Sequence, residues 1–276
     1  MVTKIIELKK PRLKNPIFIE GLPGVGNVGR IAAGYLAEEL KAVKFAELLS
    51  SHFMPFVLLH QTSAVHVLKN EFYYWKAKRK GQRDLIILIG DSQSTNQEGH
   101  YEIVETILNY IKKFGVKEIF TLAGLSVGEQ VKEPKVVGAV SHPELVKKYA
   151  KYGIDFDSGG KIGTIVGASG LLIGLGKYHG MKGVCLLGET AGFPIIPDHR
   201  SAEALLKVLI KILNIKIDTS KIERKVREME EFMKKVESVQ LKAISQLLKA
   251  QREKPCLLYT SPSPRDLSTS RMPSSA

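Results

Sequence analysis

The stretch PIFIEGLPGVGNVGRIAAGYLAEELKA, residues 16–42, decides the fold. Residues 17–19 form a short apolar run of β type, and from residue 31 onward the apolar side chains recur at helical spacing. Between these two runs stands Gly24-x-Gly26-x-x-Gly29, which is the spacing of the dinucleotide-binding fingerprint. A strand, a glycine turn and a helix in this order predict an α/β protein.

The glycine motif fits two interpretations. Three glycines at a strand-to-helix turn expose amides at a helix N-terminus to an anion, and they also let the helix pack closely on the sheet. The nucleotide interpretation needs an acidic residue about 20 positions further on, and Glu47 lies inside an apolar run rather than at a strand end. A Walker lysine is also absent. We therefore expect a packing turn, with Gly24, Gly26 and Gly29 as weak candidates for cofactor binding.

Composition places the chain among ordinary packed proteins. Its 276 residues, 44% of them hydrophobic, suit one large α/β domain with an appendage, or two domains. The two cysteines, Cys185 and Cys256, do not make a disulfide scaffold, and no signal peptide is apparent, so we expect a cytoplasmic protein.

Two partner classes are disfavoured. The glycine-rich segment 162–176 is shorter than the roughly 20 residues of a membrane-spanning helix, so no membrane is expected. The net charge of +13 is scattered rather than gathered in one stripe, which argues against nucleic acid. A basic face for an acidic partner protein, or a Lys/Glu-rich surface of the kind found in thermophiles, explains this charge better.

Strand-like and helix-like segments alternate along most of the chain. Expected strands cover residues 17–20, 45–49, 56–61, 71–77, 84–91, 119–124, 135–140, 162–167 and 184–189. Expected helices cover residues 28–41, 100–114, 142–152, 170–179 and 199–213. The pattern predicts a layered α/β sandwich with a mostly parallel or mixed central sheet.

The carboxyl ends of the parallel strands are where a ligand would bind in such a sheet. The titratable candidates at that edge are Asp91, Glu98, His100, Glu129, Glu189, Asp198 and His199, of which Asp91 and Glu189 are weak cofactor-binding candidates. No GxSxG, HExxH or CxxC motif accompanies them. We therefore expect caps and turns, with Asp198 capping the helix after residue 201, and no catalytic residue, metal or cofactor.

The character of the chain changes after residue 214. Residues 215–254 predict a coiled-coil-like helical extension, beyond an α/β core at 1–214. Its apolar positions alternate in steps of four and three, and such a seam has to pack against the chain's own core, a second hairpin helix or a partner chain. We expect partner binding through Ile222, Val226, Met229, Met233 and Val236. The Ser/Pro-rich residues 255–276 predict a disordered tail, and they resemble a translated cloning adapter.

Three blocks in this sequence resemble the archaeal form of the proteasome assembly chaperone 2 family. They are GLPGVGNVGRIAAGYL at 21–36, RDLIILIGDSQS at 83–94 and LLGETAGFPIIPDHRSAEALLKVL at 186–209. The resemblance covers roughly residues 1–250. It implies an α/β core akin to nucleoside phosphorylases without their catalytic apparatus, a C-terminal helical extension, self-association, and binding to proteasome α subunits.

Relatives in that family also end in a hydrophobic-Tyr-X tail that inserts between α subunits. Leu258, Tyr259 and Thr260 match this pattern, but they are not terminal and lie in the adapter-like stretch. The resemblance thus favours a non-enzymatic chaperone or adaptor. The alternative is an enzyme or sensor that binds a nucleotide or nucleoside through the glycine-rich strand-end loops.

Overall fold

The structure is a computed structural model, and it describes residues 2–59, 62–129, 131–157, 163–192, 196–228 and 231. The chain divides into two compact units, Met1–Met229 and Glu230–Ala276. Almost all described residues belong to the first unit, which is built around one large sheet.

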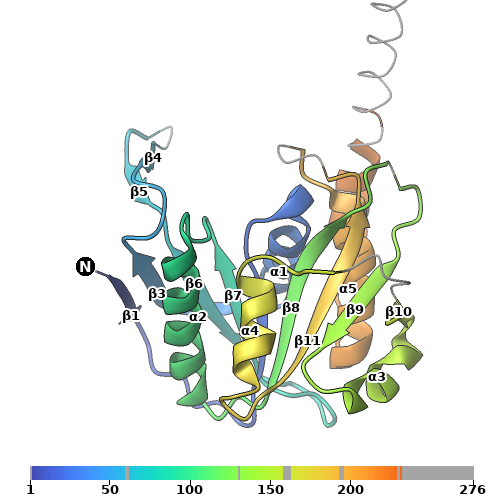
Figure 1. Ribbon diagram of the computed structural model, residues 1–276, viewed down its shortest axis with the longest axis horizontal. Helices are drawn as coiled ribbons and strands as arrows, with labels where there is room; N and C mark the ends of the chain where they lie inside the picture. The colour runs from blue at the N-terminus through green and yellow to red at the C-terminus, as the bar shows by residue number, and fades with distance from the viewer. Residues whose placement is uncertain are drawn as a thin grey trace, which may run out of the picture. The chain divides into compact units, whose positions relative to one another are not determined.

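A nine-stranded mixed sheet forms the centre, in the order β1-β3-β6-β7-β2-β8-β11-β9-β10 (Figure 1). Its four middle strands are parallel to one another and are β2 (Ile17–Gly21), β7 (Leu85–Gly90), β8 (Glu118–Ser126) and β11 (Lys182–Thr190). On one side follow the antiparallel strands β6 (Asn70–Trp75), β3 (Val43–Ser50) and β1 (Thr3–Glu7). On the other side lie β9 (Val136–Val140), antiparallel to β11, and β10 (Ile154–Asp155). The predicted α/β class with a mixed central sheet is confirmed.

Helices cover both faces of this sheet (Figure 1). One face carries α1 (Val28–Glu39) and α5 (His199–Leu213), and the other carries α2 (Gln97–Lys112) and α4 (Ala168–Gly176). The shorter helices are η1 (Val25–Asn27), α3 (Glu144–Tyr149) and η2 (Ala150–Tyr152). Because β2 alternates its side chains, Ile19 packs on the α1 face and Phe18 on the α2 face.

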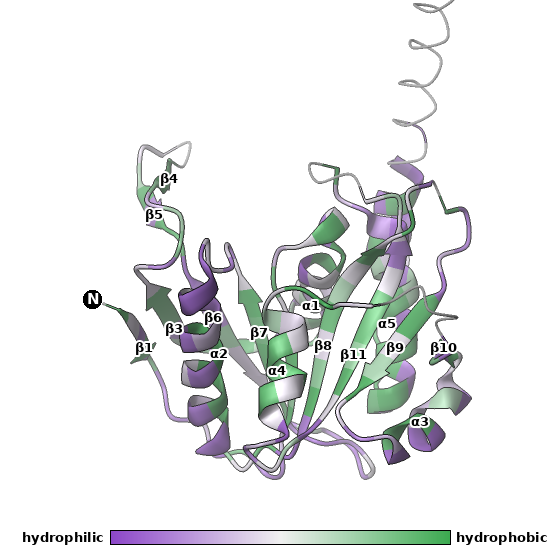
Figure 2. Ribbon diagram, in the orientation of Figure 1, coloured by the Kyte–Doolittle hydropathy of each residue, from purple (hydrophilic) through white to green (hydrophobic). Residues whose placement is uncertain are grey.

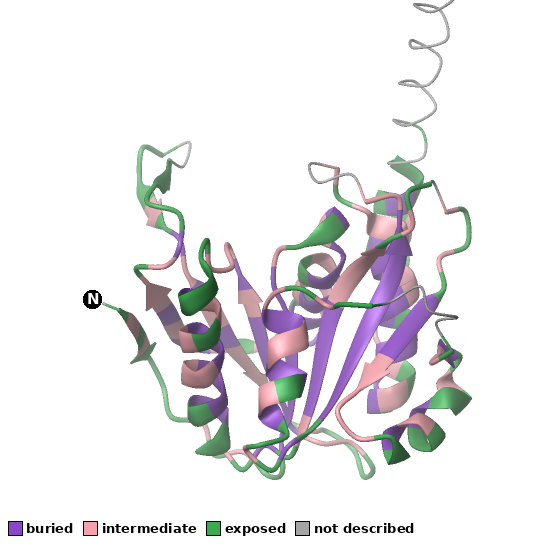
Figure 3. Ribbon diagram, viewed as in Figure 1, coloured by how far each residue is buried: buried purple, intermediate pink, exposed green. Residues whose placement is uncertain are grey.

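The middle strands are buried on both faces. Residues 85–88 of β7 have no solvent exposure, and Cys185 and Leu186 of β11 have none either. Figure 2 shows the apolar centre of the sheet, and Figure 3 shows the same strands as buried. This burial is the reason that β7 and β11 read as continuous apolar runs in the sequence.

The strand expected at residues 162–167 is wrong. Residues 163–167 contain no strand, and Gly167 serves as the N-cap of α4 with φ +88°. A short apolar run is ambiguous between a strand and the start of a helix, and here the glycines at 163 and 167 favour an irregular segment before α4.

Among the described residues no helix is long and apolar enough to cross a membrane.

The segment expected as a strand at 56–61 forms part of a separate hairpin. Strand β4 (Val57–Leu59) pairs antiparallel with β5 (Val65–Val67), and the two make their own two-stranded sheet. We call residues 53–67 the β4–β5 hairpin. It extends from the edge of the body at which the parallel strands end (Figure 1).

Candidate functional site

The glycine turn lies where β2 ends, at the carboxyl edge of the parallel strands. Gly26 has φ +60°, and a Cβ there would lie 3.0 Å from Thr190 Oγ1 and 3.2 Å from Asp198 Cβ. A Cβ on Gly29 would overlap the carbonyl oxygen of Leu122. A Cβ on Gly24 would be in ordinary contact with the Gln93 side chain, at 4.0 Å from Nε2. Two of the three glycines are therefore needed to fit α1 between β8 and the loop before α5.

Asp198, at the end of that loop, contacts the turn that precedes α1, where an anion would bind in a dinucleotide fold. The Asp198 amide donates to the Gly26 carbonyl at 2.7 Å. The Asp198 carboxylate accepts from the Ser201 amide at 2.9 Å. The single hydroxyl hydrogen of Ser201 is shared between the Asp198 carboxylate, at 2.9 Å from Oγ, and the Glu189 carbonyl. The predicted N-cap role of Asp198 is confirmed, and its carboxylate is used inside the protein.

Gln93 closes the crevice between the loops that follow β2 and β7. Its Nε2 donates to the Pro23 carbonyl at 2.6 Å, and its Oε1 accepts from the Ala168 amide at 2.9 Å. The side chain therefore ties both loops to the first turn of α4. Helices leave β2 and β7 toward opposite faces, so this crevice is the topological switch point at which α/β proteins bind ligands. In this protein a glutamine of the chain itself occupies it.

Asp91 holds elements together at the same edge. Its Oδ2 lies 2.6 Å from His66 Nε2 on β5, and its Oδ1 lies 3.3 Å from an Arg30 nitrogen on α1. Arg30 Nε also donates to the Gly90 carbonyl at 2.7 Å. Asp91 therefore links α1 to the β4–β5 hairpin.

The other acidic candidates lie apart from one another and do not form a common site. Glu189 accepts from the Lys135 amide at 3.1 Å, which joins β11 to the segment before β9. Glu98 lies in the first turn of α2, and Glu129 is exposed. Glu47 pairs with Lys44 and Lys69, each at 2.7 Å, on a strand that β6 and β7 separate from β2. It is thus too far across the sheet to serve the glycine turn.

The two histidine candidates lie at helix starts. Burial lowers the pKa of His100 and the pKa of His199, so both favour the neutral form more than a free imidazole does. The part of the chain that the structure describes contains no group of three or more His, Cys, Asp or Glu side chains that could hold a metal ion.

A buried polar cluster was missed by the sequence reasoning. Glu20 of β2 has no solvent exposure, and its carboxylate accepts from the Leu22 amide at 3.0 Å and from Ser169 Oγ at 3.0 Å. Thr121 Oγ1 in turn donates to the Ser169 carbonyl at 3.0 Å. Burial raises the pKa of Glu20 to about 7 and the pKa of the Cys185 thiol to about 12. A glutamate at the end of the apolar run before the glycine turn was the available signal.

Several exposed apolar residues gather on the β4–β5 hairpin, most of which is coloured as exposed in Figure 3. The side chains of Leu59 and Val65, which face each other across the hairpin, are 73% and 66% exposed. The other exposed apolar residues of the hairpin are Met54, Phe56, Val57, Leu58 and Val67. Residues 53–67 contain no Asp, Glu, Lys or Arg, in a chain that is 25% charged. Contiguous apolar patches of this kind mark interaction surfaces.

The described part of the C-terminal segment packs on α1. Tyr35 donates from its hydroxyl to the Asp218 carbonyl at 2.9 Å, and Lys221 pairs with Glu39 at 2.9 Å. Residues 220–228 are helical, and Ile222 is buried in the chain's own core cluster. Val226 is also buried. The other predicted partner-binding residues, Met229, Met233 and Val236, lie outside the described residues, as do Leu258, Tyr259 and Thr260.

A large mixed sheet with helices on both faces defines a protein of the layered α/β class. The chain belongs to the PAC2 family, whose model matches residues 18–237. The resemblance to the proteasome assembly chaperone 2 family is thereby confirmed.

Similar proteins come from archaea. The chain is 44% identical to Pyrococcus furiosus PbaB, described as an archaeal proteasome activator, and the match covers 86% of this chain and 99% of that chain with a TM-score of 0.80. It is 30% identical to P. furiosus PbaA, described as an archaeal homologue of proteasome-assembly chaperone, over 87% of this chain and 99% of that one, with a TM-score of 0.67. The Methanocaldococcus jannaschii protein MJ1210 is 35% identical over 92% of this chain and 94% of its own length.

Proposed function

We propose that this chain is a non-enzymatic proteasome chaperone or activator that self-associates and binds proteasome α subunits. The observation that carries the proposal is the similarity to PbaB, at 44% identity over 86% of this chain and 99% of that one. PbaA, which is described as a chaperone homologue, supports the same role.

The strand-end edge supports a role without catalysis. Gln93 bridges the switch-point crevice through two hydrogen bonds, and Asp198 uses its carboxylate to cap α5. The Asp198 amide also donates to the Gly26 carbonyl, which ties the start of α5 to the turn that precedes α1. The side chains of Gln93 and Asp198 therefore hold loops in place at the carboxyl edge of the parallel strands.

The β4–β5 hairpin is the surface that we propose for protein binding. The hairpin is held to the body through the contact between His66 and Asp91, yet it exposes apolar side chains and contains no Asp, Glu, Lys or Arg. Since the chain carries a net charge of +13, an uncharged projection is also where like-charge repulsion opposes association least. We assign the contact with α subunits to this hairpin, and self-association to the predicted seam at Met229, Met233 and Val236.

The test is capture of separately expressed proteasome α and β subunits by the full chain and by two double variants. Leu59→Glu/Val65→Glu places two charges on the cross-strand pair of the hairpin. Val166→Glu/Tyr178→Glu is the matched control, because both replaced side chains are 85% exposed and lie elsewhere. We expect the wild-type chain and the control to capture α subunits, and the hairpin variant to bind them at least about tenfold more weakly.

Two results would contradict the proposal. If the wild-type chain captures neither α subunits nor assembled rings, the proteasome role is wrong. If it captures them and the hairpin variant captures them equally well, the role stands and the hairpin is not the contact.

A further inference from the structure

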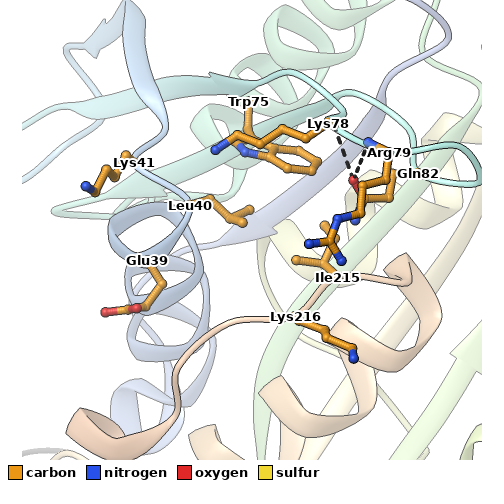
Figure 4. Close-up of a pocket in the computed structure, with 9 residues that line it drawn as sticks. All are labelled: Glu39, Leu40, Lys41, Trp75, Lys78, Arg79, Gln82, Ile215 and Lys216. Carbon is orange, nitrogen blue, oxygen red and sulfur yellow. Dashed lines mark hydrogen bonds between the residues drawn. The ribbon is translucent and has the colours of Figure 1, made fainter.

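A basic pocket lies at the edge of the sheet opposite the glycine turn, and the proposed function does not use it. It has a volume of about 260 Å³ (Figure 4). The end of α1, the end of β6, the β6–β7 loop and the segment after α5 contribute its walls. The lining residues are Glu39, Leu40, Lys41, Trp75, Lys78, Arg79, Gln82, Ile215 and Lys216.

The rim of this pocket is strongly positive. Its cations are Lys41, Lys78, Arg79 and Lys216, all exposed. Within the described part of the chain none of these four has a carboxylate at ion-pair distance, whereas the one acidic residue of the lining, Glu39, is already paired with Lys221 at 2.9 Å. Four like charges around one small space repel one another, and an anion that enters would relieve that repulsion.

The floor of the pocket is apolar and contains an unused donor. Leu40, Trp75 and Ile215 are all at least nine-tenths buried. The indole Nε1 of Trp75 is buried and has no hydrogen-bond partner among the described residues. In Figure 4 the nitrogen edge of the indole points to the side where the Lys41 and Lys78 ammonium groups are drawn. Buried donors without a partner are rare in native proteins, and a ligand oxygen is one explanation for such a group.

The cationic loop is held in place by Gln82. Its Oε1 accepts from the Lys78 amide at 3.2 Å and the Arg79 amide at 3.1 Å, and its Nε2 donates to the Asn214 carbonyl at 2.9 Å. The loop that carries two of the cations is therefore tied to the turn that precedes Lys216. The rim is preorganised, which lowers the ordering cost of binding.

From the unpaired cations, the unused indole N–H and the apolar floor, we propose that this pocket binds a carboxylate-bearing ligand. Arginine and lysine on the rim would pair with carboxylate oxygens, while Leu40 and Ile215 contact the carbon skeleton. Because Trp75 Nε1 is buried in the unliganded protein, an oxygen would accept from it only after the side chains that cover it move aside. The carboxylate could be that of a small polycarboxylic acid or of an acidic segment in a partner protein. Both sources offer the same group to the same residues.

The test uses the emission of Trp75, which is the single tryptophan of the chain and lines the pocket. The full-length protein is titrated with citrate, with a short polyglutamate peptide, with inorganic phosphate, and with sodium chloride at matched ionic strength. We expect saturable changes with citrate or the peptide that sodium chloride does not reproduce. Tighter binding of citrate identifies a small acid as the ligand, and tighter binding of the peptide identifies a partner segment.

Paired variants decide whether the rim is responsible. Lys78→Gln/Arg79→Gln should weaken carboxylate binding at least about tenfold, while Lys147→Gln/Lys177→Gln removes the same charge from exposed positions elsewhere and should not. Calorimetry on Trp75→Phe, which lacks the N–H, should show weaker binding than the wild-type chain. The proposal is overturned if sodium chloride reproduces the citrate response, if phosphate saturates the site and carboxylates do not, or if the two paired variants bind alike.

Discussion

Gly29 on α1 and Leu122 on β8 are in backbone-to-backbone contact, since a Cβ on Gly29 would overlap the Leu122 carbonyl oxygen. The third glycine of the fingerprint therefore sets the distance between the first helix and the sheet. Its role is close packing, which is one of the two interpretations that the sequence leaves open.

Gly29→Ala should destabilise the protein by about 3 kcal/mol or more, because the new methyl group meets backbone that cannot turn away. Gly34→Ala is the matched control in the same helix, since a Cβ there has nothing within 4 Å. We expect it to raise the free energy of unfolding by up to about 1 kcal/mol. Denaturant titration of the two variants measures both effects, and equal midpoints would contradict the close-contact argument.

Glu20→Gln should change the pH dependence of stability. The pKa of Glu20 is raised by burial from 4.5 to about 7, so the folded protein holds this proton more tightly than the unfolded chain does. The contribution of Glu20 is fully present below pH 4.5 and is lost as the pH rises to about 7. Relative to the wild-type chain, Glu20→Gln should therefore gain about 3 kcal/mol across that window.

Glu47→Gln provides a control of opposite sign. The hydrogen bonds from Lys44 and Lys69 hold the pKa of Glu47 below its usual value. Its stabilisation is therefore present above the ordinary carboxyl pKa and is lost in more acidic solution. Glu47→Gln should be least stable relative to the wild-type chain at neutral pH. A stability difference for Glu20→Gln that is constant from pH 4.5 to 7 would show that Glu20 does not titrate in that window.

Cys185 should be unreactive in the folded protein. Its thiol has no solvent exposure, and burial raises its pKa to about 12, so the nucleophilic thiolate is scarce at neutral pH. In a Cys256→Ser variant, an aromatic disulfide reagent should find no reactive thiol until denaturant is added. Labelling in native buffer at the rate of a free thiol would show that β11 opens readily.

The sequence predicted well those strands and helices whose pattern of burial repeats regularly from residue to residue. Strands β7 and β11 are apolar at nearly every position because both of their faces are buried. Helices α2 and α5 are amphipathic; the Asp198 cap of α5 was predicted, whereas α2 begins at Gln97 after an Asn96 cap, earlier than the expected residue 100. The expected strand at 162–167 failed because apolar composition alone cannot separate a strand from the approach to a helix.

Sheet order and the buried polar contacts could not be obtained in this way. Glu47 follows the glycine turn along the chain, yet β6 and β7 lie between its strand and β2, and no local pattern encodes that pairing. The hydrogen bonds of Gln93 and Glu20 could not be predicted either, because their partners Ala168 and Ser169 are 75 and 149 positions away in the sequence. The sequence predicted that the candidate polar loops follow the carboxyl ends of the parallel strands. The hydrogen bonds that these loops make depend on tertiary contacts, which the sequence did not reveal.

The helix after residue 220 offers a test of the predicted extension in two parts. Ile222→Ala removes a side chain that is 1% exposed and belongs to the core cluster, so it should lower the free energy of unfolding by about 2–5 kcal/mol. Chemical denaturation monitored by circular dichroism measures this change. An unchanged midpoint would mean that the helix at 220–228 does not add to the stability of the body.

The double variant Met229→Glu/Met233→Glu tests the part of the predicted seam that follows Ile222. Two carboxylates in a helix–helix contact would each lose hydration without a partner, which costs several kcal/mol or drives protonation. The α/β body packs its core with residues from other segments, so its far-UV circular dichroism and unfolding midpoint should remain close to those of the wild-type chain. We expect a smaller oligomer by light scattering, and a matched Arg227→Glu variant on the exposed side of the helix should keep its size. If the double variant also keeps its oligomer size, association does not use this seam, and the uncharged β4–β5 hairpin becomes the surface to test for self-association.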